Sequence, residues 1–480
     1  MHFGGIDYAI LLIYLAAMVW IGFLFAGKQK TADDFFLAGR KMPWLAVAMS
    51  MYASLTSAVT YMGLPGLAYR SNVTLLAVAV VSPLLAPILI FVFYPVYRKL
   101  NVTTSYEYIG IRFGATARKT AAVLFLCARL GWMATVIYAP ALALSIATGL
   151  PLVFSILTMG LLATLYTVMG GLAAVLWTDV VQFITLIGGA IVVAVFLIRL
   201  SPDGATGIIH FARENNHLQL DGSISLWRMT LTGVAISFFF QMMQDYGTDQ
   251  VTVQRLLSTK TKGGMAKAIL FNAGTDFCLV SLLLFIGLGL FAYYQLNPGT
   301  LPEAISGDKI FPYFIAHVLP TGLSGLLIAA IFAAAMSSMD SGINSMATVV
   351  VNDFIFPVVG KEKLEGKPVV RLARIITALF GVLATALSVY LFYMSSAKGI
   401  IETFATFMGL FSAPVLALFL LGLLTKRGLF KAWIPSAVLS IAFTGWLQTT
   451  EVSWIWYFPS GFLISFIGGW LGSMLFNRSV

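Results

Sequence analysis

The 480-residue sequence is poor in charged residues, cysteine and histidine. Charged residues make up 10% of the chain, against about 25% in soluble proteins, so a water-soluble globular protein is excluded. Both cysteines, Cys127 and Cys278, lie in apolar stretches, which indicates neither a disulfide framework nor a CxxC metal or redox centre. The four histidines lack metal-ligand spacing and no GxxxxGK[ST] loop is present, so we expect neither an enzyme nor a nucleotide-driven pump.

Long hydrophobic runs dominate the chain instead. Hydrophobic residues make up 59% of the sequence, and the mean hydropathy is +0.92. Read in windows of about 19 residues, this pattern predicts an all-α integral membrane protein with about 13 transmembrane helices in one transporter domain, residues 1–480. The predicted spans are residues 7–26, 44–69, 74–97, 120–148, 150–169, 172–198, 227–254, 265–294, 321–351, 371–396, 401–424, 430–448 and 453–476.

The basic residues indicate how the chain crosses the membrane. Most of the 29 lysines and arginines, Arg255 among them, fall on one side of the predicted topology. Because cytoplasmic segments carry an excess of Lys and Arg, we expect the N-terminus outside and the C-terminus in the cytoplasm. The net charge of +10 therefore reflects multi-pass insertion in a plasma membrane, expected to be the bacterial inner membrane, and not a nucleic-acid surface.

Two predicted spans carry polar residues and helix breakers at membrane depth. Residues 44–69 include "MYASLTSAVTYMGLPGLAY", where Gly63, Pro65 and Gly66 occur, and residues 227–254 include "ISFFFQMMQDYGTDQVTVQRLL". A membrane helix can break where neighbouring polar groups satisfy the freed backbone, so we expect both spans to be discontinuous.

The two interrupted spans are five spans apart, which predicts a pair of inverted repeats with a binding site between them. The repeats would cover residues 44–198 and 227–424, and residues 7–26 and 430–476 would be peripheral helices.

An oxygen cage for Na⁺ can be assembled from the first break and a later polar span. Na⁺ prefers oxygen ligands, and carbonyls of unwound helices supply them. We expect the carbonyls of Ala53 and Thr56 to face the carbonyl of Ala334 and the hydroxyls of Ser337 and Ser338.

Charged residues within predicted spans need a partner or a function, since an isolated charge in lipid is costly. Asp340, in "SSMDSGINS", and Asp179, in "AVLWTDVVQF", could hold a cation between them, or one could be protonated. Arg129 lies about ten residues into its span, where it could neutralise an aspartate or clamp an anionic substrate. Asp276 has no obvious partner and is assigned no role.

Several motifs together resemble the sodium:solute symporter family, which has the five-plus-five inverted-repeat fold of the LeuT type. The motifs are "TADDFFLAGRKMPW", "ASLTSAVT", "TTSYEYIGIRFG", "YTVMGGLAAVLWTDVVQ", "TVQRLLSTKT" and "AAIFAAAMSSMDSGINS". The resemblance implies the same Na⁺ cage, and a second Na⁺ site near Asp179, Asp340 and Ser341. Two departures stand out: Asp340 replaces a hydroxyl residue of the sialic-acid members, and Trp132 replaces their arginine.

The substrate class follows from weaker similarities. "SAVTYMGLPGLAYR" and "VIYAPALAL" look most like the branch that transports monocarboxylates, iodide and carboxylate vitamins. We therefore expect a Na⁺-coupled symporter that imports a small organic solute, an anion, by alternating access. Alternatives are sialic acid, a sugar or an amino acid as solute, coupling to protons, or a channel-like permease.

The expected substrate-binding residues are polar side chains near the two breaks. Each could instead serve only as an interhelical hydrogen bond. They are Ser57, Thr60, Arg129, Gln241, Gln244 and Tyr246.

Overall fold

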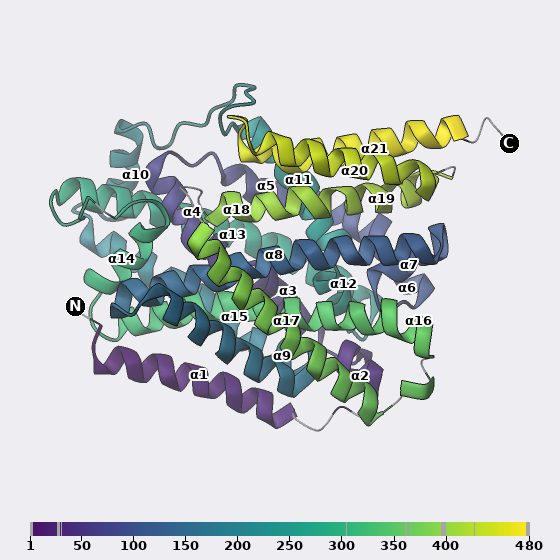
Figure 1. Cartoon of the computed structure of the whole chain (residues 1–480). Helices are drawn as coiled ribbons and strands as arrows, with labels where there is room; N and C mark the ends of the chain where they lie inside the picture. Colours follow the sequence, from purple (N-terminus) through teal and green to yellow (C-terminus); the bar gives the residue numbers. More distant parts are fainter. Residues whose placement is uncertain are drawn as a thin grey trace.

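The computed structural model describes residues 3–25, 29, 31–303, 305–360, 362–364, 366–394, 400–426 and 428–476. Across these residues the protein is helical, and the only β-bridge among them is isolated, between Met42 and Thr259 (Figure 1). Ten helices in the described chain are long and apolar enough to cross a membrane, or eleven with one bent pair. The predicted class, an all-α multi-pass membrane protein, is confirmed.

The helices that build the membrane domain run in chain order as follows. They are α1 (Gly5–Phe25), α3 (Trp44–Leu55), α4 (Ala58–Arg70), α5 (Leu76–Ile88), α6 (Tyr94–Leu100), α8 (Ala115–Thr148), α9 (Leu152–Leu200), α11 (Leu231–Gly247), α12 (Gln250–Leu257), α13 (Lys262–Leu296), α15 (Leu323–Val349), α17 (Lys367–Met394), α18 (Ile400–Phe407), α19 (Ala413–Leu424), α20 (Phe430–Leu447) and α21 (Tyr457–Phe476). Shorter helices are α2 (Ala32–Leu37), α7 (Ser105–Phe113), α10 (Gly204–Glu214), α14 (Ile310–His317) and α16 (Phe356–Val359). Single π-helical stretches at Leu89–Phe93, Val350–Ile355 and Met408–Ser412 join α5 to α6, α15 to α16 and α18 to α19.

The count of thirteen spans is not confirmed. The predicted spans 150–169 and 172–198 both lie in α9, as two helices that meet at Gly171, where the backbone is not helical: φ is 59° and ψ is −170°. The first arm of α9 contributes only a short apolar helix, Leu152–Leu165. The predicted span 227–254 is divided into α11 and α12, and neither part is long enough to cross alone.

The predicted discontinuity in residues 44–69 is present, but it lies earlier than the glycines and the proline. Helix α3 ends at Leu55, α4 begins at Ala58, and their axes differ by 59°. Pro65 and Gly66 lie inside α4, where small residues permit close packing: a Cβ on Gly66 would be 3.2 Å from the carbonyl oxygen of Gly307.

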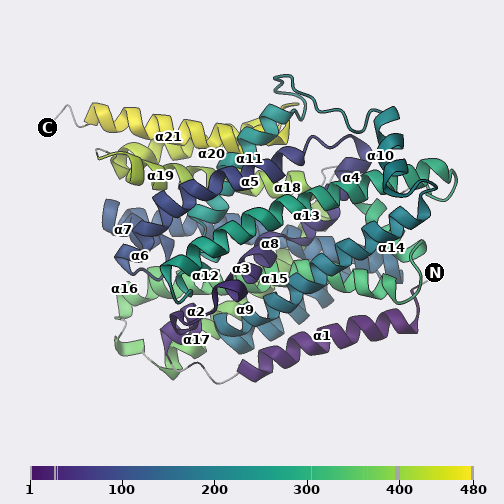
Figure 2. The same ribbon diagram turned by 180° about the vertical axis from the view of Figure 1, so that it is seen from behind.

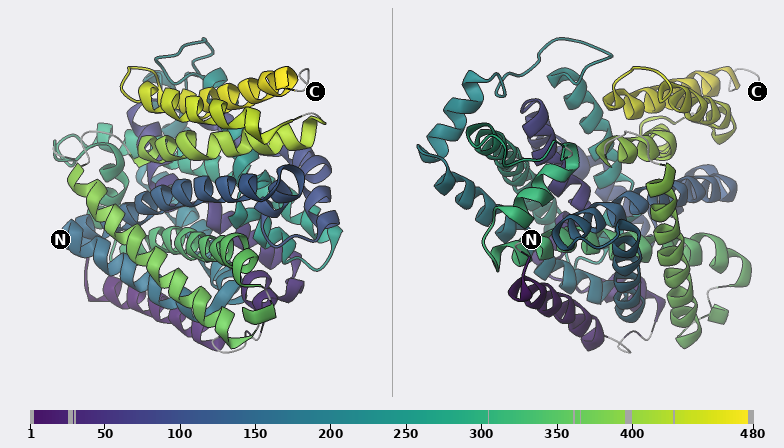
Figure 3. Two further views of the ribbon diagram at one scale, coloured as in Figure 1. Left: turned by 45° about the vertical axis from the view of Figure 1, so that its right-hand side comes forward. Right: turned by 60° about the vertical axis from the view of Figure 1, so that its left-hand side comes forward.

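The helices are arranged around α15. In its most apolar window 94% of the residues are buried, compared with 17% in α1. Helix α1 runs along one edge of the molecule, and α20 and α21 lie together at the opposite edge (Figures 1 and 2). Figure 3 shows the same separation from two further directions, with α1 far from the yellow C-terminal pair. The inverted-repeat relation of residues 44–198 and 227–424 stays a prediction.

Because α13 packs closely on α4, adding one methyl group at Gly287 should destabilise the protein. A Cβ on Gly287 would be 2.5 Å from the backbone oxygen of Pro65, so Gly287→Ala forces two helices apart. We expect a loss of about 1–3 kcal/mol, seen as a lower thermal midpoint of the purified protein. Gly274→Ala on the same helix meets nothing within 4 Å and is the control. Equal midpoints for the two variants would contradict this packing.

Candidate functional site

The predicted Na⁺ cage comes together where α3 ends beside α15. The Ser337 hydroxyl donates to the carbonyl of Ala53 at 2.7 Å, and it lies 3.2 Å from the carbonyl of Ala334. The Ser338 hydroxyl donates to the carbonyl of Ser54 at 3.0 Å. Thr56 follows the last residue of α3 with non-helical ψ of 87°, which turns its carbonyl out of the helical direction. The carbonyl and hydroxyl oxygens of both elements thus converge.

The chemistry of this cage fits a monovalent hard cation. Its donors are neutral backbone carbonyls and hydroxyls, which suit Na⁺ more than a transition metal. Within the described residues, no three histidine, cysteine or acidic side chains lie close enough together to hold a metal ion. Ser337 and Ser338 are fully buried, and Thr56 is 5% exposed, so their oxygens face protein, not lipid.

The predicted second cation site contains an arginine that the sequence did not place there. Oδ2 of Asp179 accepts hydrogen bonds from Ser50 at 2.5 Å and from Ser54 at 3.3 Å. Nη2 of Arg255 lies 3.1 Å from the same oxygen, and both side chains are fully buried. The guanidinium of Arg255 therefore supplies the positive charge beside Asp179.

The other two predicted members of this site lie beside the same ion pair. Oγ of Ser341 is 2.8 Å from Oγ of Ser54 and 3.1 Å from Oδ1 of Asp340. Arg255 also contacts the Ser341 hydroxyl. Asp179 and Ser341 thus both contact the guanidinium of Arg255, and Asp340 is linked to them through the Ser341 hydroxyl.

The burial of Arg255 is a feature that its placement in the predicted topology does not indicate. Arg255 was counted among the basic residues of a cytoplasmic segment, yet it lies in α12 with no exposed surface. Its Nε donates to Ser50 at 2.9 Å and its Nη1 donates to the carbonyl of Val251 at 3.0 Å. Every side of this guanidinium that the structure describes is held by α3, α9, α12 or α15.

Arg129 pairs with an aspartate, but not with either aspartate that was expected. Its guanidinium forms an ion pair with Asp249, and both residues are at most 3% exposed. The central carbon of its guanidinium lies 4.2 Å from the centroid of the Trp132 ring, which adds a cation–π contact. Arg129 therefore links α8 to the point where the predicted span 227–254 is interrupted.

The interruption between α11 and α12 is supported from several sides. Asp249 caps α12, and its Oδ1 accepts from the backbone N–H of Val251 at 2.8 Å. The hydroxyl of Tyr97 donates to the carbonyl of Gly247 at 2.8 Å, and the Tyr94 hydroxyl donates to the carbonyl of Tyr246. The backbone groups that the break frees therefore have partners, as a membrane interior requires.

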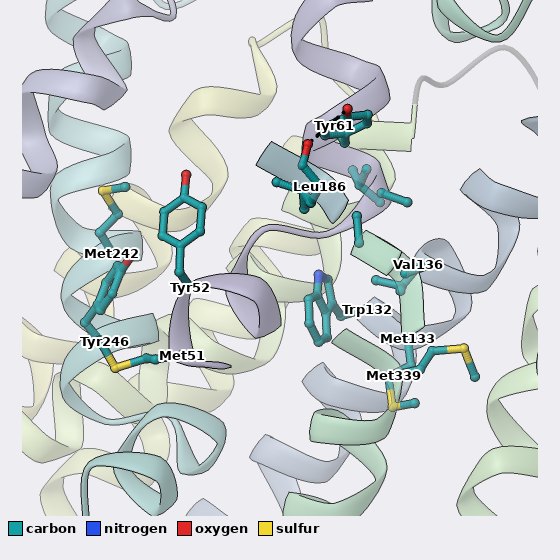
Figure 4. Packing of buried hydrophobic residues seen from close by; sticks show 14 of the residues in the cluster. Met51, Tyr52, Tyr61, Trp132, Met133, Val136, Leu186, Met242, Tyr246 and Met339 are labelled. Atoms are coloured by element: carbon teal, nitrogen blue, oxygen red, sulfur yellow. Dashed lines mark hydrogen bonds between the residues drawn. The ribbon is translucent and has the colours of Figure 1, made fainter. Parts of the chain in front are cut away.

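A cavity of about 120 Å³ lies between α3, α4, α5, α11, α13, α18 and the Trp454 segment. Thr56, one of the predicted Na⁺ ligands, forms part of its wall, so ion cage and cavity adjoin. Figure 4 shows Met51 and Tyr52 of α3 beside Met242 and Tyr246 of α11, near this wall. The lining residues are Leu55, Thr56, Val59, Thr60, Leu64, Leu75, Val78, Phe238, Gln241, Met242, Asp245, Tyr246, Asp276, Val280, Ile401, Phe404 and Trp454.

Three of the six predicted substrate residues line this cavity: Thr60, Gln241 and Tyr246. The other three do not. Ser57 precedes α4 and is 2% exposed. Gln244 lies 3.4 Å from Oδ2 of Asp249, and Arg129 is paired with the same carboxylate.

Two carboxylates that the sequence analysis gave no substrate role do line the cavity, Asp245 and Asp276. In the sequence, Asp245 is one of several polar residues of the span 227–254, and Asp276 has no obvious partner. The lack of a local partner could have indicated a binding site, because burying an unpaired carboxylate in an apolar helix costs free energy and is rare without a function.

The sequence and the structure were compared with known proteins. The model of the sodium:solute symporter family matches residues 35–429. The sodium/sialic acid symporter of Aliivibrio fischeri is 34% identical over all of this chain and 95% of its own length. The sodium-coupled monocarboxylate transporter 2 of Bos taurus is 30% identical over 93% of this chain and 73% of its own length. The solved structure of a Na⁺-coupled sialic acid symporter, substrate-bound and outward-open, aligns with a TM-score of 0.90, 30% identity and 98% of both chains.

The buried pair of Asp179 and Arg255 predicts a non-additive effect. Asp179→Asn leaves a guanidinium unpaired in the interior, so we expect a loss of about 3–5 kcal/mol of stability. Adding Arg255→Gln should restore part of that loss, because it removes the unpaired charge. Thermal unfolding of the purified variants measures both effects.

The control is an exposed pair. Asp33 lies 3.5 Å from Arg40 and is 49% exposed, so Asp33→Asn should cost less than about 1 kcal/mol. Losses of Asp179→Asn and Arg255→Gln that simply add would show that the two charges do not interact.

Proposed function

The chain belongs to the sodium:solute symporter family, and from this premise we propose that it imports a small organic solute together with Na⁺ by alternating access. Na⁺ is the coupling ion of this family, and the protein is not an enzyme. We place the coupled ion in the cage of Ala53, Thr56, Ala334, Ser337 and Ser338, and the solute in the adjoining cavity.

The placement of the ion is supported mainly by one contact. The Ser337 hydroxyl of α15 lies 2.7 Å from the carbonyl oxygen of Ala53, near the end of α3. A cation bound between these oxygens would join α15 to a helix that is broken just beyond the contact. Because Thr56 belongs both to the cage and to the cavity wall, an ion that fixes α3 also fixes part of the solute site. The two ligands should therefore raise each other's affinity by the same factor.

The membrane potential supplies energy for this coupling. One Na⁺ entering a negative interior gains about 2.3 kcal/mol per 100 mV. In our proposal one ion at the cage is sufficient. The second site expected at Asp179, Asp340 and Ser341 has less support, since Arg255 already balances the charge of Asp179.

The orientation and location are inferred from the sequence and the relatives. The excess of basic residues on one side of the predicted topology supports an N-terminus outside and a C-terminus in the cytoplasm. Bacterial relatives such as the Aliivibrio fischeri symporter support the bacterial inner membrane as the location.

An anionic solute is supported by the names of the relatives, which are symporters for sialic acid or monocarboxylates. The cavity itself gives that class little support. Among the described residues that line it, none is basic, and Arg129 is held by Asp249 outside the lining. A sugar or an amino acid needs no arginine clamp and is a neutral or zwitterionic alternative.

Removal of one hydroxyl tests the ion site. Ser337→Ala deletes a ligand that faces α3, and we expect the Na⁺ concentration for half-maximal thermal stabilisation to rise at least about tenfold, or about 1.4 kcal/mol. Potassium at equal ionic strength is the reference. Ser345→Ala is the matched control, because the Ser345 hydroxyl donates to Gly342 of its own helix. The proposal is contradicted if Na⁺ and K⁺ stabilise the unaltered protein equally, or if both variants respond alike.

A further inference from the structure

We propose that the transported solute is a compact organic cation, with a protonated amine or a quaternary ammonium group, bound by Asp245 of α11 and Asp276 of α13. This inference rests on the proposed function, because it names the solute class of the same cavity. Both carboxylates line that cavity beside Gln241 and Thr60.

The two carboxylates differ from four other buried aspartates of the chain, which have cationic or backbone partners. A fifth, Asp340, accepts a hydrogen bond from the Ser341 hydroxyl. Asp179 is paired with Arg255, Asp249 with Arg129, and Asp353 with Arg118 at 2.5 Å. Oδ1 of Asp7 accepts from the backbone N–H groups of Gly322 and Gly325, each at 2.7 Å. These four aspartates have structural partners that offset their charge. Asp245 and Asp276 have no ion pair with any described residue.

Asp276 shows most directly that a ligand is needed. Its side chain is 7% exposed, and its Oδ2 has no hydrogen-bond partner. Its Oδ1 lies 3.5 Å from the Tyr52 hydroxyl, and the hydroxyl of Ser82 also interacts with this carboxylate. A buried carboxylate oxygen without a donor costs free energy, so its presence at a cavity wall points to a ligand that supplies a positive charge or a donor. Asp245 is partly exposed to the same cavity and adds a second carboxylate to its wall.

No nearby positive charge cancels this pair at the wall. The guanidinium of Arg129 acts on Asp245 from a distance, but Asp249 stands in ion contact with it, so Arg129 and Asp249 together are neutral. None of the described lining residues is lysine, arginine or histidine. In their ionised form the two carboxylates therefore attract a cation in the cavity and repel an anion.

The remaining lining residues suit an organic cation more than a metal ion. Phe238, Tyr246, Phe404 and Trp454 present aromatic rings to the cavity. Aromatic faces attract ammonium groups, and pockets of this kind recognise quaternary ammonium ligands. The volume of about 120 Å³ is below the ~300–1,000 Å³ of drug-sized pockets, so the solute is compact.

The test compares solutes of equal shape and different charge. Thermal stabilisation of the purified protein is measured in NaCl and in KCl with choline, ethylammonium and guanidinium, with the neutral choline isostere 3,3-dimethylbutan-1-ol, and with the anions nicotinate and N-acetylneuraminate. We expect at least one cation to stabilise the protein in NaCl. If that cation is choline, the neutral isostere should need at least a tenfold higher concentration, and the anions should give no shift.

Variants then locate the binding. Asp276→Asn and Asp245→Asn should each raise the half-saturating cation concentration at least tenfold. Glu303→Gln, which removes the same charge from an exposed position, should leave it unchanged. If Asp276→Asn fails to fold, the comparison of choline with its neutral isostere still decides the matter.

Three results would overturn the inference: stabilisation by an anion in NaCl, equal effects of choline and its isostere, or no shift with any of the cations. Each of these leaves the symporter proposal intact, provided that NaCl alone stabilises the protein more than KCl. Equal stabilisation by the two salts would instead contradict the Na⁺ site, whatever the solutes do.

Discussion

Within a bilayer, a helix can be interrupted only where the protein itself satisfies the backbone groups that the break frees. Helix α3 meets this condition through Ser337 and Ser338 of α15, whose hydroxyls reach the carbonyls of Ala53 and Ser54. The break after α11 meets it through two tyrosines of α6 and a capping carboxylate. The oxygens that the first break turns toward α15 are also the ligands that Na⁺ prefers. The requirement to satisfy the backbone and the capacity to bind an ion thus arise from one arrangement.

The buried arginines complete this arrangement and limit what the solute can be. Arg255 fastens α12 to Asp179 of α9 and to Ser50 of α3, and Arg129 fastens α8 to the cap of α12. Both guanidiniums hold helices together, so neither contributes positive charge to the cavity wall. The carboxylates of Asp245 and Asp276 therefore determine the sign of the charge that a solute meets there. Our inference of a cationic solute rests on these two carboxylates, whereas the named relatives are symporters for sialic acid or monocarboxylates.

The sequence predicted what depends on local pattern. Apolar runs predicted the helical membrane class, and the hydroxyls beside Ala334 predicted which residues meet Ala53. The predictions that failed depend on which side chains meet in the tertiary structure. Arg255 lies at the end of an apolar segment. Hydropathy alone does not show whether such an arginine faces the cytoplasm or is buried against a residue far away in the sequence, here Asp179, 76 positions earlier. The predicted count of thirteen exceeds the ten or eleven candidate spans of the described residues, because apolar helices as short as Leu152–Leu165 were counted as spans. Asp276 was missed because its cavity is formed by helices that are distant in sequence.

The central claim is that Na⁺ and the solute move together. The most direct test reconstitutes the protein in liposomes on a solid-supported membrane and records current when the solutes above are added. We expect an inward positive current for one solute in Na⁺, little or none when K⁺ replaces Na⁺, and none in Na⁺ without solute. An equal current in K⁺ would contradict Na⁺ coupling, and a sustained current in Na⁺ without solute would indicate a channel.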